Sequence, residues 1–223
     1  MLPLTHTATH PEVLGGWLMM IGFGAYHGLN PGMGWLFALA LGLQQKNIRA
    51  VWRSLLPISL GHALSIALVA GAVLLAGELI STATLRFITA GLLLGFGVIK
   101  LLTYYRHPRW VGMRVSMRDL LLWSFLMAMA HGAGLMVAPT LLGIATPAAH
   151  HGASLGGGAM VAVAVFIHTA AMLAVMATVA GVVYYKAGLA ILRRGWVNFD
   201  LIWAVALLVV GLSALYHAFT LYA

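Results

Sequence analysis

The segment Gly24-Ala-Tyr-His-Gly-Leu-Asn-Pro-Gly-Met-Gly-Trp35 lies within an apolar run from Val13 to Leu43 that is long enough to cross a bilayer. Pro31 has no N–H group, so it cannot bond to the carbonyl of His27, and Gly32 loosens the backbone further. In hydrocarbon, such freed backbone groups are tolerated only where they face protein or a polar cavity. The segment therefore predicts a broken helix that places His27 at a functional site inside a membrane.

The composition is that of an integral membrane protein. The chain has 223 residues, of which 62% are hydrophobic and only 7% are charged, and its mean hydropathy is +1.00. A soluble domain needs far more charge on its surface, so this composition excludes a soluble class. The absence of cysteine excludes disulfides, thiolate metal sites and dithiol redox relays. The net charge of +8 lies in short connections between apolar runs, so we expect no nucleic-acid partner.

Six apolar runs each reach the length of a membrane-spanning helix. They are residues 13–44, 54–77, 84–104, 118–142, 157–184 and 197–220. Eleven of the 12 Lys and Arg residues fall after the first, third and fifth runs, and only Arg86 falls after the second. The positive-inside rule then predicts six transmembrane helices with both termini outside. No positively charged segment leads into the first run, so we expect that run to be retained rather than cleaved.

The two halves of the chain carry similar motifs. The His27 motif of the first run is matched by His131-Gly-Ala-Gly in the fourth, and His62 of the second run is matched by His168 in the fifth. The two pairs are separated by nearly equal numbers of residues. Because each half has three spans, halves related by such a repeat are inverted, which places a binding site between them near the midplane. Chance similarity in Ala- and Leu-rich sequence is the alternative.

We therefore expect an all-α integral membrane protein built from two inverted three-helix repeats. Residues 13–104 would form the first repeat and residues 118–223 the second. Residues 1–12 would form an extracytoplasmic tail, and residues 105–117 a basic cytoplasmic linker. Small residues in the third run would let helices approach closely, and protomers of a homo-oligomer could meet there; these are Gly91, Gly95 and Gly97.

Four histidines from four different runs are the candidate metal ligands. Counted at about 1.5 Å per residue from the ends of their runs, His27, His62, His131 and His168 all fall well inside the bilayer. Neutral imidazole binds Ni, Co, Zn and Cu, and it also carries protons. Each histidine could instead hold two helices together through a hydrogen bond. Four of them on different helices favour a shared functional site.

Other residues could complete such a site. Thioether ligands would suit a soft ion such as Cu(I), although most methionines in an apolar chain fill gaps in the packing; the candidates are Met33, Met127 and Met172. The candidate polar lining residues are Asn30, Ser59, Ser65 and Thr169. A second helix break is predicted at Pro139, by analogy with Pro31 and Gly32 in the first half. Acidic residues fall only near the ends of the runs, which argues against a Ca or Mg pathway.

The segment His27-Gly-Leu-Asn-Pro-Gly-Met-Gly34 resembles the first-span motif of the nickel/cobalt efflux (NicO-type) family, and Leu60-Gly-His-Ala-Leu-Ser-Ile-Ala-Leu68 resembles the second-span histidine motif of that family. The resemblance covers roughly residues 20–70; beyond them, the arrangement of spans is similar to that of the lysine-exporter superfamily. It implies divalent metal transport with His27 and His62 at the site. Met33 stands where the family has its second histidine, and Trp35 stands where it has lysine.

These observations predict a transporter rather than an enzyme. It would be a multi-pass protein of the bacterial cytoplasmic (inner) membrane that moves a transition-metal cation, Ni- or Co-like or else Cu or Zn, through a midplane histidine site. The ion would be cargo, and no prosthetic group is expected. The partners would be the lipid bilayer and the transported ion or solute. Two alternatives stay open: a proton-coupled exporter of a small organic solute with histidines as relays, and a haem-binding membrane subunit.

Overall fold

The computed structural model describes residues 11–103, 116–150, 156–187 and 199–222, and within these ranges the chain is helical with no strand. The helices are α1 (Pro11–Leu29), the short 3-10 helix η1 (Pro31–Met33), α2 (Trp35–Gln44), α3 (Ile48–Leu79), α4 (Thr82–Leu102), α5 (Met117–His131), α6 (Ala133–His150), α7 (Gly156–Val182) with its π-helical continuation η2 (Val183–Ala187), and α9 (Phe199–Tyr222). Most of the predicted tail (residues 1–10) and of the predicted linker (residues 105–115) lies outside the described residues.

Four of these helices are long and apolar enough to cross a membrane, namely α3, α4, α7 and α9. A fifth span results if α5 and the first part of α6 are counted together. Large apolar side chains point outward along these helices, among them Leu75 on α3, Phe166 on α7 and Val209 on α9. Such an exterior is suited to contact with lipid rather than water. The chain is therefore compatible with a multi-pass membrane protein, as its composition predicts.

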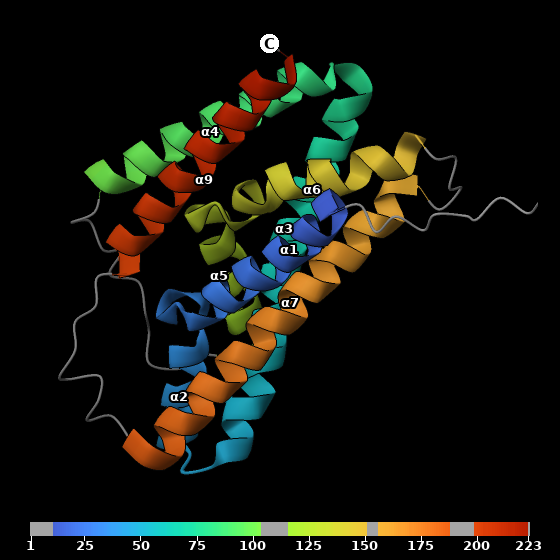
Figure 1. Cartoon of the computed structure of the whole chain (residues 1–223). Helices are drawn as coiled ribbons and strands as arrows, with labels where there is room; N and C mark the ends of the chain where they lie inside the picture. Colours follow the sequence, from blue (N-terminus) through green and yellow to red (C-terminus); the bar gives the residue numbers. More distant parts are fainter. Residues whose placement is uncertain (1–10, 104–115, 151–155, 188–198, 223) are drawn as a thin grey trace, which may run out of the picture.

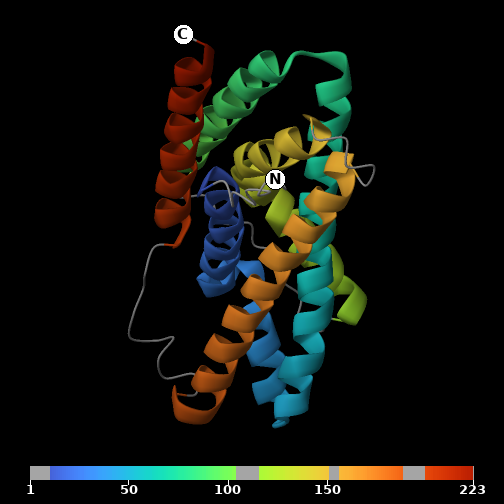
Figure 2. The same ribbon diagram turned by 45° about the vertical axis from the view of Figure 1, so that its right-hand side comes forward.

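Helices α1, α3, α5, α6 and α7 pack closely together, and α4 and α9 form a pair beside them. Figure 1 shows α1 lying along α7, while α4 and α9 lie side by side across the top of the view. Figure 2 shows the same pairing of α4 with α9 from another side, with α3 running the height of the molecule. Besides these pairs, α3 packs closely against both α5 and α7. The two predicted halves are thus interleaved, because α1 packs on α7 and α5 packs on α3.

The predicted break at Pro31 and Gly32 is confirmed. Helix α1 ends at Leu29, and the Asn30 side chain caps η1 by accepting a hydrogen bond from the Gly32 N–H at 2.9 Å. Gly34 then starts α2 with φ of 122°, a conformation that a residue with a Cβ rarely adopts. The indole N–H of Trp35 donates to the Leu29 carbonyl at 3.1 Å, so one of the freed carbonyls at the end of α1 finds a partner.

The second break is at Gly132, and its prediction at Pro139 is wrong. Gly132 adopts a left-handed conformation, with φ of 70°, that ends α5, and α6 leaves at a bend of 69°. Pro139 lies inside α6, which continues through it, just as α3 continues through Pro57. An internal proline removes one backbone hydrogen bond, and a helix packed among neighbours can tolerate that loss. A glycine in the left-handed region turns the backbone away from the helix axis and ends the helix.

Close approach of helix backbones brings histidine-bearing segments together. A Cβ on Gly24 of α1 would clash with the carbonyl oxygen of His168, and a Cβ on Gly28 would lie only 2.5 Å from the carbonyl oxygen of Met172. On the other side, a Cβ on Gly61 of α3 would clash with the carbonyl oxygen of Leu121 in α5. Glycine at these positions therefore lets α1 lie against α7, and α3 against α5, at backbone contact.

Candidate metal centre

His27 is held in place by the helix that carries it. It lies in the last turn of α1, just before the break, and its side chain is fully buried. Its Nδ1–H donates to the carbonyl of Phe23, one turn earlier, at 2.6 Å. This bond fixes the ring and places the proton on Nδ1, so Nε2 carries a lone pair, as in histidines that bind metals. Among the described residues, Nε2 has no hydrogen-bond partner.

His62 and His168 come from the middle of two long helices. His62 is on α3 and His168 is on α7, and both side chains are fully buried. Neither ring nitrogen of His62 has a hydrogen-bond partner among the described residues, whereas the His168 ring has the Met20 carbonyl of α1 as a weak backbone partner. A buried polar group without a partner costs about 1–3 kcal/mol. These rings therefore call for a functional explanation.

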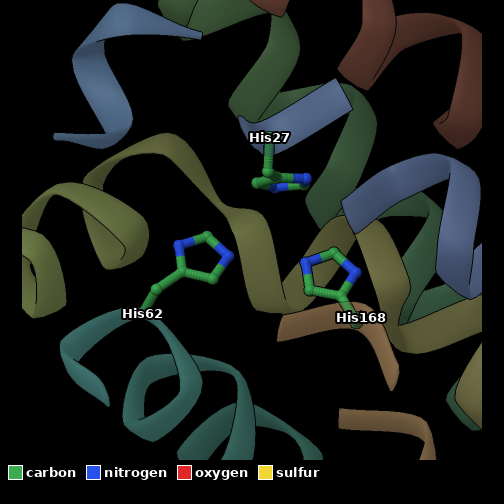
Figure 3. A group of neighbouring side chains, drawn as sticks. All are labelled: His27, His62 and His168. Atoms are coloured by element: carbon green, nitrogen blue, oxygen red, sulfur yellow. The ribbon is translucent and has the colours of Figure 1, made fainter. Parts of the chain in front are cut away.

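The three rings face a common space. The His62 and His168 planes are nearly parallel, at 3°, with ring centroids 5.6 Å apart. The His27 ring stands across both, with centroid distances of 5.0 Å to His62 and 4.9 Å to His168. Figure 3 shows a nitrogen of His62 and a nitrogen of His168 directed toward each other, with the His27 ring above them. Three helices, α1, α3 and α7, thus converge on one point.

The nitrogens of these three rings fit a metal ion. One ligand nitrogen from each of His27, His62 and His168 can be chosen so that all three lie within 4.8 Å of one another. An ion held at about 2.0–2.1 Å from three nitrogens requires them roughly 3.3–3.6 Å apart. Where the nitrogens are farther apart than that, binding requires the rings to move closer together. We call His27, His62 and His168 the three-histidine cluster.

The fourth predicted histidine, His131, lies beside the cluster and is not part of it. It occupies the last turn of α5 and is 4% exposed. Its Nδ1–H donates to the carbonyl of Met127 at 2.8 Å. Its ring meets the edge of the Trp203 indole at a centroid distance of 5.6 Å, while Trp203 also meets His27 at 4.7 Å. Trp203 therefore contacts both His131 and a member of the cluster.

The other predicted residues have different surroundings. Met33 and Met172 are buried in separate apolar clusters, Met33 with Trp203 and Met172 with residues of α2 and α3. Met127 is half-buried, and its carbonyl is the partner of His131. Asn30 serves as the cap of η1. Buried hydroxyls without a partner among the described residues belong to Ser59 and Ser65, each three residues from His62 on α3.

Trp203 and Tyr26 were not predicted from the sequence. Trp203 is fully buried, stacks on Tyr26 at a centroid distance of 5.4 Å, and donates its indole N–H to the carbonyl of His131. A tryptophan in the middle of an apolar run is a usable signal, because a buried indole N–H needs an acceptor. Such an acceptor is available where a helix ends inside the membrane and leaves its last carbonyls free.

No carboxylate with a described side chain belongs to the cluster. Glu78 is sixteen residues beyond His62 on α3, which is roughly 24 Å along the helix. Asp119 is in the first turn of α5, where it forms a capping box with Ser116. The described donor set is therefore three neutral imidazoles, the form in which histidine binds metals. The side chains of Glu12 and Asp200 lie outside the described residues.

The chemistry open to the cluster is binding of a borderline or soft cation, or transfer of a proton between imidazoles. Comparison of this chain with protein-family models, with curated proteins and with solved structures finds no match. The function is therefore inferred from the residues of the cluster and the helices that carry them.

Proposed function

We propose that this chain is a membrane transporter of a transition-metal cation, which His27, His62 and His168 hold between the two halves of the molecule. The observation that carries the proposal is the set of buried ring nitrogens in the cluster, of which Nε2 of His27 and both nitrogens of His62 have no hydrogen-bond partner among the described residues. They lie on three helices whose ligand atoms already come within 4.8 Å of one another. A bound ion would account for the free energy spent in burying them.

The position of the cluster supports a transported ion. His62 and His168 each lie near the middle of a helix long enough to span the membrane. An ionisable side chain at that depth is a default marker of an ion pathway. Three protein ligands leave a coordination position open, whereas structural zinc sites are closed by four. An open site suits an ion that must also leave.

The interleaved halves support an inverted repeat, while six spans with both termini outside remain the prediction of the positive-inside rule. Both α1 and α5 end at a break with a histidine in the last turn, and α3 and α7 each carry a histidine at mid-helix. The third members, α4 and α9, pack on each other. In such a repeat α1 corresponds to α5 and α3 corresponds to α7. The α1–α7 contact therefore has the α5–α3 contact as its counterpart, and both contacts are extensive. We infer that the ion site lies on the axis relating the halves.

The resemblance to the nickel/cobalt efflux family makes Ni²⁺ and Co²⁺ the first ions to test, and imidazole ligands also suit Zn²⁺ and copper. We expect purified protein in liposomes to carry at least one of these ions across the bilayer, with flux measured by a metal-sensitive dye inside the vesicles. His168→Ala should reduce the flux to the level of empty vesicles, since the ion loses one of three ligands.

The matched control is His217→Ala, because His217 is exposed on α9 and should be dispensable. Absence of flux for all four metals, with wild-type protein folded in the vesicles, would contradict the proposal. Proton movement that depends on His168 under those conditions would favour the proton-coupled solute exporter instead.

A further inference from the structure

The two helix breaks have matching local structures. His27 and His131 each lie in the last turn before a break, and each donates Nδ1–H to the carbonyl four residues earlier, at 2.6 and 2.8 Å. Each broken helix ends with a carbonyl that accepts an indole N–H, from Trp35 for α1 and from Trp203 for α5. In both histidines the bond places the proton on Nδ1 and the lone pair on Nε2.

The two histidines differ in one respect, which is their distance from the His62–His168 pair. His27 stands directly on that pair, with ring centroids 5.0 and 4.9 Å away. His131 is not among the residues whose ligand atoms come together there, and the Trp203 indole meets both His131 and His27 edge-on. One half of the molecule therefore contributes its break histidine to the cluster while the other half holds its equivalent outside.

Each break histidine lies on a helix that packs against a helix of the central pair. Helix α1, which carries His27, lies along α7, which carries His168. Helix α5, which carries His131, lies along α3, which carries His62. Glycine makes backbone contact in both helix pairs, at Gly24 in the first and at Gly61 in the second. Each break histidine thus has one member of the central pair on the helix beside it.

We propose that His131 replaces His27 on the His62–His168 pair when the transporter opens to the other side, so that His62, His131 and His168 form a second metal site. This rests on the proposed function and on the inverted repeat. Inverted halves change access by exchanging conformations around a fixed site. In the second state the end of α5 would lie next to the His62–His168 pair, and the end of α1 would lie away from it. The ion keeps three nitrogen ligands in both states, which matters because leaving it undercoordinated in a dry centre is costly.

The test uses His27→Asn and His131→Asn. Asparagine Nδ2–H stands close to where histidine Nδ1–H stands, so each variant can keep its bond to the helix carbonyl while losing Nε2. Binding of Ni²⁺, Co²⁺, Zn²⁺ and Cu⁺, each alone, is titrated in detergent, and flux is measured in liposomes. His168→Ala is the reference for loss of a shared ligand, and His217→Ala is the control.

Each asparagine variant should lower affinity by no more than about tenfold, because the other state still offers three histidines and binding shifts the population toward it. The double variant His27→Asn/His131→Asn should lose as much affinity as His168→Ala, at least about 100-fold. Both single variants should nevertheless stop flux, since each lacks a complete site in one state.

Two results would overturn the exchange while leaving metal transport intact. One is a His131→Asn variant that binds and transports like wild type. The other is a His27→Asn variant that loses as much affinity as His168→Ala. A wild-type protein that binds none of the four ions would instead overturn the proposed function itself, and the exchange with it. Size-exclusion elution and melting temperature of every variant establish that binding is compared between folded proteins.

Discussion

Replacing His62 by leucine is expected to lower the affinity for the transported ion at least about 100-fold without lowering the stability of the ion-free protein. Loss of a residue that merely orients a metal ligand already costs about 10–100-fold in affinity, so loss of a ligand should cost more. Both nitrogens of His62 are buried without a partner among the described residues. Leucine removes those unpaired groups and fills much of the same volume, which relieves about 1–3 kcal/mol per group.

The two readouts separate a ligand from a structural residue. Ion affinity is measured by equilibrium titration in detergent, and stability by thermal unfolding in the presence of a chelator. If His62 held helices together through hydrogen bonds, leucine would lower the melting temperature of the ion-free protein. A lower melting temperature together with unchanged affinity would contradict the assignment. His217→Leu, at an exposed position on α9, should change neither readout.

We expect Trp203→Ala to lower the free energy of unfolding by about 3–5 kcal/mol, more than any other single substitution considered. Trp203 is fully buried and packs on Tyr26, His27 and His131. Its removal also leaves the last carbonyl of α5 without its indole donor. Trp203→Phe keeps most of the packing and loses only the N–H, so its cost should be about 1–3 kcal/mol.

Thermal or denaturant unfolding followed by circular dichroism measures these losses. The matched control is Trp52→Ala, because Trp52 is 42% exposed on α3 and should cost much less. Equal losses for Trp52→Ala and Trp203→Ala would show that Trp203 has no special place in the core. A Trp203→Phe variant as unstable as Trp203→Ala would show that the indole N–H, rather than ring packing, is the main contribution.

Apolar length and local backbone chemistry were enough to predict the helices and the first break. Every predicted run corresponds to helix where the structure describes it, because burial of apolar side chains leaves the backbone no other way to satisfy its hydrogen bonds. The break at Pro31 follows from the missing N–H and the glycines beside it. Four or five of the described helices have the length and composition to cross a membrane. Six spans therefore stay a prediction.

The second break and the membership of the cluster depend on tertiary packing. The effect of Pro139 was overestimated because one missing hydrogen bond does not end a packed helix, whereas the left-handed backbone of Gly132 does. Counting residues along each run gives the depth of a histidine but not the direction in which it points. For that reason His27, His62 and His168 could not be distinguished from His131 until the structure placed their ligand atoms relative to one another.

The most direct test of the three-histidine cluster is X-ray absorption spectroscopy at the metal edge of wild-type protein loaded with one equivalent of the transported ion. The cluster predicts three imidazole nitrogens at about 2.0–2.1 Å, with the characteristic scattering of the outer ring atoms. His62→Leu loaded at high metal concentration should lose one of the three. A first shell of oxygen atoms without imidazole scattering, unchanged by His62→Leu, would contradict the assignment of His27, His62 and His168 as the ion site.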